Sequence, residues 1–394
     1  MSDMFAHQPD LRARHAMKWS AFDEDILPLW VADMDFQSPP AVIEALTARV
    51  QAGTFGYTMD YPPLREAIVE RMARLYDWHI EPQDIVFVPG MVVTLNMITR
   101  AFGKAGDGVL MQTPVYGPFL SVPAHNGKFA QTVDLVQENL TAHTFAYRQD
   151  TDAFARAITR QSSLFYLCNP HNPGGMVYSR AELEALATLC LKNNVTIVSD
   201  EIHSDLILEG AHIPIATLSP EVAQRTITLI APSKTFNLPA LTTSIAIVQN
   251  KDMRERLTYE VQRTGLHVNI LGLVAADAAY RGASEWLAGL LGLLRANRDK
   301  LVGYVGEPWQ DVRVTVPQAT YLAYLDFSAL ATPEDVPPAQ FFLERARVAL
   351  NNGDFFRNVN ATSGRDNYVR LNFGCAPATL EAALARMTHA MREL

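Results

Sequence analysis

The sequence has little of three features that mark large classes of proteins: paired cysteines, long apolar runs and clustered positive charge. It contains three cysteines, Cys168, Cys190 and Cys375, which are odd in number and lack the close spacing of a zinc site. These cysteines predict buried thiols and exclude a disulfide framework or a cysteine-based metal centre.

Membrane and nucleic-acid functions are disfavoured as well. The longest apolar stretch, Leu287–Leu294, is far shorter than the roughly 20 residues that span a bilayer, and the N-terminal MSDMFAHQPDLRARHAMKW has no apolar signal core. The 33 lysines and arginines are outnumbered by 42 aspartates and glutamates, which gives a formal net charge of −9 without any basic run. This balance argues against a nucleic-acid or anionic-membrane surface. We expect a soluble, cytoplasmic protein that binds neither.

What the sequence does contain is an alternation of short apolar runs and amphipathic stretches, in a chain of 394 residues with 48% hydrophobic content. Continuous apolar strands separated by helices predict a mostly parallel sheet with helices on both faces. Ser179 and Glu182 form a capping-box pair at the start of one of these helices. The expected strands are Asp84–Pro89, Gly108–Gln112, Leu164–Cys168, Val195–Ser199, Thr226–Ile230 and Ser244–Val248.

The pattern changes near residue 280. A long helical stretch around Trp286–Leu301 precedes a strand at 320–327, a helix near Pro338–Ala349 and a strand at 368–373. We therefore expect a large domain at 46–280 and a smaller α+β domain at 281–394, which the N-terminal segment 1–45 joins.

Polar side chains follow three successive strands of the predicted sheet. Asn172 comes after the third run, Asp200 after the fourth and Lys234 after the fifth. Ligands of open parallel sheets bind beyond the carboxyl ends of the strands, so these three side chains are expected at one edge. Singly, each fits ordinary turn or capping chemistry better, but the ordered set matches pyridoxal 5′-phosphate (PLP) chemistry. That chemistry needs a lysine that forms an imine, a carboxylate on the pyridine nitrogen and a donor to the phenolic oxygen.

Further residues complete the predicted cofactor site. Gly90 precedes a helical pattern, which places the amides of Met91 and Val92 at a helix N-terminus suited to a phosphate. Ser233 supplies a hydroxyl beside the lysine, and Tyr116 suits a ring stacked on the pyridine. His203 is either a second donor to the phenolic oxygen or a structural histidine; the sequence leaves both open.

Blocks along nearly the whole chain resemble the cystathionine β-lyase (carbon–sulfur lyase) subfamily of fold-type I PLP enzymes, within the class I/II aminotransferase superfamily. The blocks that carry the resemblance are WVADMDFQSPPAVIEAL (30–46), FGYT (55–58), TPVYGPF (113–119), CNPHNPGG (168–175), SDEIHSDL (199–206), SKTFNLPAL (233–241), TYLAYLDF (320–327) and VRLNFGCA (369–376).

The resemblance implies the fold-type I architecture and the same roles for Lys234, Asp200, Asn172 and Tyr116. It also implies residues that periodicity does not reveal. Arg370 matches the arginine that binds the substrate α-carboxylate, and Asp33 falls in a block expected to contact substrate. Tyr57 matches a tyrosine that reaches the cofactor phosphate and substrate of the neighbouring subunit, which implies a homodimer with shared active sites.

The chain departs from the family pattern at four places. Gly174 stands where a threonine is usual, and Pro239-Ala240 replaces the commoner Ala-Gly. Thr242 stands eight residues after the lysine, where many aminotransferases have a phosphate-binding arginine. The segment NNGDFF (351–356) differs from the usual stretch rich in proline and glycine, which leaves the preferred leaving group open.

The expected activity is α,β-elimination on the small-molecule amino acid L-cystathionine or related cysteine S-conjugates, giving a thiol (homocysteine), pyruvate and ammonia. An aminotransferase would use the same residues and is the first alternative. A PLP-bound regulatory protein that acts through protein contacts is the alternative from another class.

Overall fold

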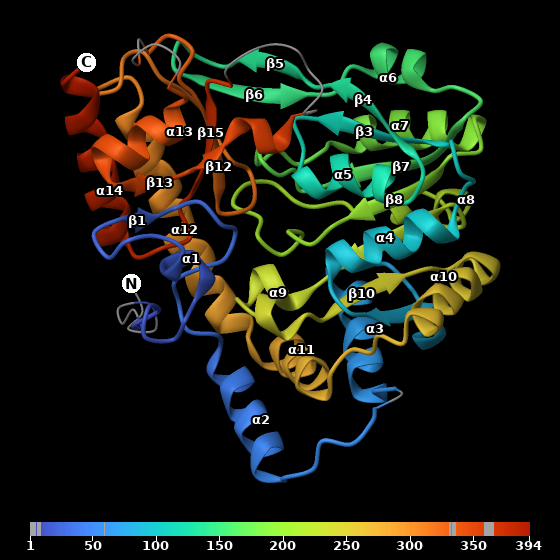
Figure 1. Ribbon diagram of the computed structural model, residues 1–394. Helices are drawn as coiled ribbons and strands as arrows, with labels where there is room; N and C mark the ends of the chain where they lie inside the picture. Colours follow the sequence, from blue (N-terminus) through green and yellow to red (C-terminus); the bar gives the residue numbers. More distant parts are fainter. Residues whose placement is uncertain (1–4, 6–8, 59, 331, 333–335, 358–365) are drawn as a thin grey trace.

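The computed structural model describes residue 5 and residues 9–58, 60–330, 332, 336–357 and 366–394 (Figure 1). In the described chain the largest sheet has seven strands in the order β2-β10-β9-β8-β7-β3-β4, and only β10 runs antiparallel to its neighbours. Its strands are β2 (Ile85–Val88), β3 (Gly108–Thr113), β4 (Phe129–Asp134), β7 (Ser162–Cys168), β8 (Thr196–Asp200), β9 (Thr226–Ile230) and β10 (Ser244–Ile247).

All six expected strands are present within one or two residues. The seventh, β4, was not predicted, because it lies at the sheet edge and its side chains are mostly half-exposed, so it has no continuous apolar run. The mostly parallel sheet confirms the predicted fold class.

Helices cover both faces of this sheet, because its central strands are apolar on both sides. Along β7, Leu164 and Tyr166 pack into one hydrophobic core with α4, α5 and α10, while Phe165 and Leu167 pack into another with α6, α7 and α8. These helices are α4 (Met91–Ala101), α5 (Gly117–His125), α6 (Thr151–Ala157), α7 (Arg180–Lys192), α8 (Pro220–Ala223) and α10 (Lys251–Thr264). The capping box predicted at Ser179 and Glu182 begins α7.

A second sheet of six strands, counted over the described residues, has the order β14-β15-β12-β11-β6-β5. Its strands are β5 (Val136–Asn139), β6 (Thr144–Arg148), β11 (Arg313–Thr315), β12 (Leu322–Asp326), β14 (Asn351–Asn352) and β15 (Tyr368–Asn372). The strands expected at 320–327 and 368–373 are therefore confirmed. The hairpin β5-β6 comes from the middle of the chain, and its strand β6 pairs with β11, which comes from the C-terminal part.

The remaining helices are distributed over the large sheet, the second sheet and the N-terminal segment. They are α1 (Met17–Ser20), α2 (Pro40–Gln51), α3 (Pro62–Tyr76), α9 (Pro232–Thr235), α11 (Ile270–Gly282), α12 (Ser284–Tyr304), α13 (Pro338–Phe341) and α14 (Pro377–Arg392). The helix expected at 338–349 ends earlier, at Ala346, because Arg347 is left-handed (φ 54°) and Val348–Ala349 forms β13, which pairs with β1 (Leu27–Pro28). None of the helices in the described ranges is long and apolar enough to cross a membrane.

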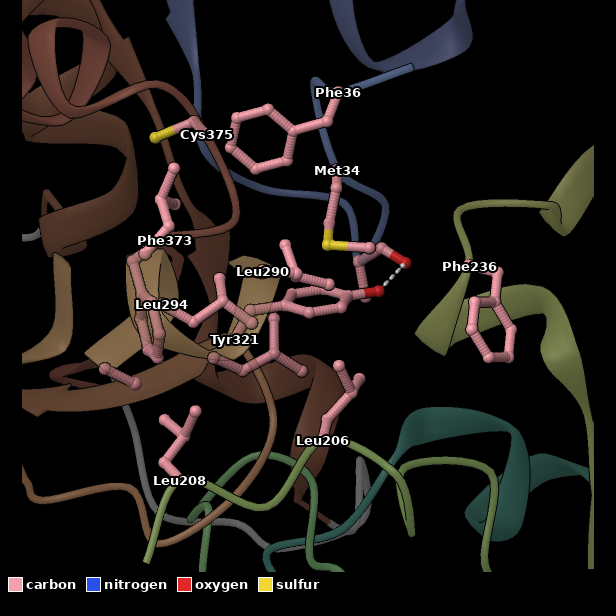
Figure 2. Close-up of a cluster of buried hydrophobic side chains, with 14 of the residues drawn as sticks. Met34, Phe36, Leu206, Leu208, Phe236, Leu290, Leu294, Tyr321, Phe373 and Cys375 are labelled. Atoms are coloured by element: carbon pink, nitrogen blue, oxygen red, sulfur yellow. Dashed lines mark hydrogen bonds between the residues drawn. The ribbon is translucent and has the colours of Figure 1, made fainter. Parts of the chain in front are cut away.

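A buried apolar cluster joins the N-terminal segment to both halves of the fold (Figure 2). Met34 and Phe36 pack there with Leu290 and Leu294 of α12 and with Tyr321, which precedes β12. The hydroxyl of Tyr321 donates a hydrogen bond to the Ala32 carbonyl oxygen at 3.0 Å. This packing holds the 30–36 segment against the carboxyl edge of the large sheet.

Candidate active site

A cavity of about 350 Å³ lies at the carboxyl ends of β7, β8 and β9. The neighbouring strand ends are tied together, since Asn169 N–H donates to the Asp200 carbonyl (3.0 Å) and Glu201 N–H to the Leu229 carbonyl (2.8 Å). Nine of the residues predicted from the sequence line the cavity, namely Met91, Val92, Tyr116, Asn172, Asp200, His203, Ser233, Lys234 and Arg370. The structure therefore brings together side chains that are up to 279 positions apart in the sequence, from Met91 to Arg370.

Lys234 lies on the short helix α9, which Pro232 begins directly after β9. Its ammonium donates to the Ala32 carbonyl oxygen at 2.6 Å. Burial and the nearby charge of Arg370 lower the pKa of Lys234 to about 8, although Asp33 and Asp200 act in the opposite direction. A lysine with this pKa is a far larger fraction neutral near pH 7 than an exposed lysine, as a nucleophile and base requires.

Asp200 ends β8 and is buried, with its Oδ1 accepting a hydrogen bond from the Ile202 N–H at 3.1 Å. Burial raises its pKa to about 7. A buried carboxylate of this kind is stabilised by any cationic partner that enters the cavity. A protonated pyridine nitrogen is such a partner, so the site fits PLP here.

Arg370 reaches the cavity from β15 of the second sheet. One guanidinium nitrogen donates to Asn172 Oδ1 at 3.0 Å and another to the Trp30 carbonyl at 2.8 Å, while its Nε has no protein partner among the described residues. The group lies over the Phe356 ring, 4.9 Å from its centroid. Burial lowers its pKa to about 10, so it stays cationic at neutral pH. A buried, oriented and incompletely paired guanidinium is suited to bind a carboxylate.

His203 also faces the cavity and is buried, with its Nδ1 unpaired within the described part of the chain. Burial, followed by the charges of Lys234 and Arg370, lowers its pKa to about 3, which keeps the imidazole neutral. A neutral imidazole that borders the cavity can form a hydrogen bond with a ligand, so the ligand-donor role stays a proposal beside the structural one.

The phosphate end of the site is formed by backbone and hydroxyl groups. Gly90, with φ 95°, is the residue before α4, which begins at Met91. The first amides of a helix have no carbonyl partner within it, so those of Met91 and Val92 are available to a phosphate. Ser233 and Thr242 line the same cavity, and Thr242 takes the left-handed φ of 48°. These donors, together with Asp200 and Lys234 at the ring end, fit PLP without the arginine that many relatives carry.

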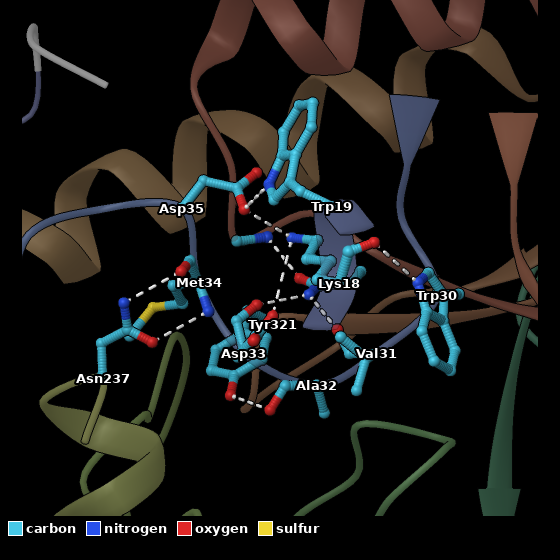
Figure 3. A network of polar contacts seen from close by, with 12 residues as sticks. Lys18, Trp19, Trp30, Val31, Ala32, Asp33, Met34, Asp35, Asn237 and Tyr321 are labelled. Carbon is cyan, nitrogen blue, oxygen red and sulfur yellow. Dashed lines mark hydrogen bonds and ion pairs between the residues drawn. The ribbon is translucent and has the colours of Figure 1, made fainter. Parts of the chain in front are cut away.

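Two predicted residues lie outside the cavity. Tyr57 is fully exposed and lines a different groove, of about 620 Å³, with residues 267–271. Asp33 belongs to a buried ion network, 4.0 Å from the ammonium of Lys18 (Figure 3). Neither side chain therefore lines the cavity with the nine residues above.

The network around Lys18 was not predicted from the sequence. Lys18 is buried and pairs with Asp35 at 3.0 Å, and Trp19 Nε1 donates to the same carboxylate at 2.8 Å (Figure 3). Burial alone would lower the pKa of Lys18, but Asp35 and Asp33 outweigh it, so the pKa is raised and the ammonium stays charged. The network fixes residues 33–35 of the 30–36 segment beside the cavity.

Side chains from β15, from α9 and from the residue pair after α9 bind the carbonyl groups of this segment. Arg370 and Lys234 bind the carbonyls of residues 30 and 32, and Asn372 Nδ2 binds those of residues 31 and 33, both at 2.6 Å. Asn237, which follows α9, binds Met34 and Phe36 in the same way. The WVADMDF block is therefore a positioned backbone strip along the cavity, a role that no single residue of the block signals in the sequence.

The fold and this site together define a fold-type I PLP-dependent enzyme. A family model for class I and II aminotransferases matches residues 24–387. The chain belongs to this family, in the branch of the cystathionine β-lyases and carbon–sulfur lyases.

Three similar proteins support this assignment. Cystathionine β-lyase PatB of Bacillus subtilis is 37% identical over 384 residues, which cover 95% of this chain and 96% of PatB. The crystal structure of OvoB matches with a TM-score of 0.90 at 39% identity, over 98% of each chain. The PLP-bound C–S lyase of Staphylococcus hominis matches with a TM-score of 0.90 at 28% identity, over 99% and 98% of the two chains. The predicted family, cofactor and lyase class are confirmed.

Proposed function

We propose that this enzyme cleaves the Cβ–S bond of cysteine S-conjugates, L-cystathionine among them, and releases a thiol, pyruvate and ammonia. The observation that carries the proposal is the meeting of Lys234, Asp200 and Arg370 in one cavity of about 350 Å³. Bound PLP supplies an electron sink that acidifies the substrate Cα–H. The aminotransferase alternative is not favoured, since PatB and the Staphylococcus hominis enzyme carry lyase names.

The proposed residue roles follow from position and charge. Lys234 would hold the cofactor covalently, and its amine would be the base that removes the substrate Cα proton, for which its lowered pKa suits it. The electron pair of the broken Cβ–S bond leaves on sulfur, which takes up a proton, and the remaining aminoacrylate is hydrolysed to pyruvate and ammonia. Asp200 keeps the ring nitrogen protonated. Arg370, oriented by Asn172, holds the α-carboxylate.

The other cavity residues hold the cofactor. We assign the phosphate to the amides of Met91 and Val92 and to Ser233, and the phenolic oxygen to Asn172 and His203. Tyr116 lines the same space and supplies a ring that stacks on the pyridine.

The proposed activity is tested by incubating purified holoenzyme with L-cystathionine and with S-methyl-L-cysteine, without any keto acid. We expect pyruvate and free thiol in equal amounts over many turnovers. One half-turnover that stops with the cofactor as pyridoxamine phosphate would support the aminotransferase instead.

Arg370→Lys is expected to raise KM for S-methyl-L-cysteine by about tenfold to a hundredfold with a smaller change in kcat, since lysine keeps the charge but loses the two-pronged carboxylate contact. Steady-state kinetics measure this. Arg148→Lys is the matched control, because Arg148 lies on β6, pairs with Glu138 and does not line the cavity. Equal effects of the two substitutions would contradict the assignment.

We propose a homodimer in which Tyr57 completes the neighbouring subunit's site. Figure 1 shows α2 and the extended segment after it projecting from the body of the molecule. Several apolar side chains of this region are exposed, among them Val50, Phe55 and Tyr57. Phe55 and Tyr57 line the groove of about 620 Å³, and the exposed Leu266 lines a neighbouring groove. Exposed apolar surface of this kind is typical of an interface.

The shared site is tested by mixing subunits. Lys234→Ala and Tyr57→Ala enzymes, each impaired alone, are expected to recover about a quarter of wild-type activity after equimolar subunit exchange, because half of the dimers then carry one intact site. No recovery, despite mass-spectrometric evidence of mixed dimers, would place Tyr57 in its own subunit's site or outside catalysis.

The domain division expected from the sequence also remains a proposal, with segments 1–45, 46–280 and 281–394. The pairing of β1 with β13 supports the contact of the first segment with the last. The hairpin β5-β6 then reaches from the large domain into the second sheet.

A further inference from the structure

The wall of the cavity next to Arg370 is built by the segment 351–356, where the sequence departs from the family pattern. Its first part, β14, pairs antiparallel with β15, so that Asn351 lies opposite Arg370. The 3-10 turn Gly353–Phe356 follows, and Asn351 and Phe355 both line the cavity. One short segment thus connects the proposed carboxylate-binding residue to the cavity rim.

Phe355 is held on this rim by packing. Its ring centroid lies 6.0 Å from that of Tyr116, with the planes tilted by 62°, and it remains 44% exposed. Gly117 allows this position, since a Cβ there would lie 2.7 Å from the Phe355 carbonyl oxygen and 2.9 Å from its ring. Trp30 lines the same cavity, so Phe355 and Trp30 offer aromatic surface in addition to the Tyr116 ring assigned to the cofactor.

The charged groups of the cavity already have roles. Among the described lining residues the ionic side chains are Asp200, Lys234 and Arg370, and His203 is neutral. The leaving group of L-cystathionine is homocysteine, which carries its own ammonium and carboxylate. Removing those charges from water without partners is unfavourable, whereas burial of an alkyl or aryl group against aromatic rings is favourable.

We infer that Phe355 is a specificity-determining residue that selects cysteine S-conjugates with an alkyl or aryl leaving thiol over L-cystathionine. This inference rests on the proposed carbon–sulfur lyase function and names the substrate class of the same site. The leaving substituent lies against the Phe355 ring while Arg370 holds the α-carboxylate.

The test compares S-benzyl-L-cysteine, S-methyl-L-cysteine and L-cystathionine as substrates of the holoenzyme. We expect the wild-type kcat/KM to be about tenfold or more higher for the benzyl conjugate than for L-cystathionine. Phe355→Ala is expected to lower the benzyl-to-methyl ratio of kcat/KM by about tenfold, and Phe355→Leu by less, since leucine keeps part of the apolar contact.

Phe129→Ala is the matched control, because Phe129 is a similarly exposed phenylalanine on β4 and does not line the cavity. It is expected to keep the wild-type ratio. A wild-type preference for L-cystathionine, or a ratio that stays the same in Phe355→Ala, would overturn the inference.

A binding measurement separates this inference from the lyase proposal. Calorimetric titration of PLP-loaded Lys234→Ala enzyme is expected to show tighter binding of the benzyl than of the methyl conjugate, and the added Phe355→Ala change is expected to remove most of the difference. If the wild-type enzyme releases no pyruvate from any conjugate, the lyase proposal fails and the binding difference still decides the role of Phe355. If the difference in affinity between the benzyl and methyl conjugates were the same in the single and the double variant, that role would be refuted.

Discussion

Replacing Lys234 with alanine is expected to lower kcat for pyruvate release by about four orders of magnitude, because the substitution removes both the covalent attachment of the cofactor and the base for the Cα proton. The structure gives a specific reason for the size of the effect. The amine lies in a buried site where burial and Arg370 lower its pKa to about 8, and no other lysine lines the cavity among the described residues. Steady-state assay of the purified variant with added PLP measures the loss.

The control is Lys251→Ala, since Lys251 is an exposed lysine at the start of α10 that pairs with Glu255 at 3.8 Å and does not line the cavity. It is expected to keep wild-type activity. The Lys234→Ala result also separates the enzyme from the regulatory alternative, because a function exerted only through protein contacts would survive this substitution. Residual activity within about tenfold of wild type would contradict the assigned role of Lys234.

Asp200→Asn is expected to lower kcat by about two to three orders of magnitude while the cofactor stays attached. Asparagine keeps the shape of the side chain, but a neutral amide does not hold the ring nitrogen in its protonated form. The loss of activity is large because Asp200 is buried and, within the described lining, no other carboxylate in the cavity could stabilise the protonated ring nitrogen. Comparison of kcat with the PLP content of each purified protein measures the effect.

Asp134→Asn serves as the matched control. Asp134 also ends a strand of the same sheet, β4, but it is exposed, accepts a hydrogen bond from Thr113 and does not line the cavity. We expect less than about a twofold change in kcat for this variant. If Asp200→Asn lost activity only in proportion to lost PLP, Asp200 would act in cofactor binding and not in its chemistry.

The set Asn172, Asp200 and Lys234 was predictable because each residue lies at the end of an apolar strand or within four residues after it. The carboxyl ends of neighbouring parallel strands lie at one edge of the sheet, so such residues come together there whatever the conformation of the connecting loops. The register confirms this, since Asp200 lies opposite Cys168 of β7 and Leu229 of β9. Arg370 was identified only through family resemblance, because it arrives from a different sheet.

Other parts of the site leave no local signal in the sequence. Lys18 resembles a surface lysine until the fold buries it between Asp33 and Asp35. Phe355 lies in a short, polar-looking segment, and only the pairing of β14 with β15 brings it to the cavity. The hairpin β5-β6 was missed for a related reason: β5 is short and mostly exposed, and β6 is only five residues long and buries Phe145 and Tyr147 where it pairs with β11.

The most direct test of the account is to locate the covalently bound cofactor. Borohydride reduction of the holoenzyme, followed by proteolysis and mass spectrometry, is expected to find one PLP group per chain, on Lys234. Modification of any other lysine, or the absence of modification in a protein that retains lyase activity, would contradict the assignment of this cavity as the active site.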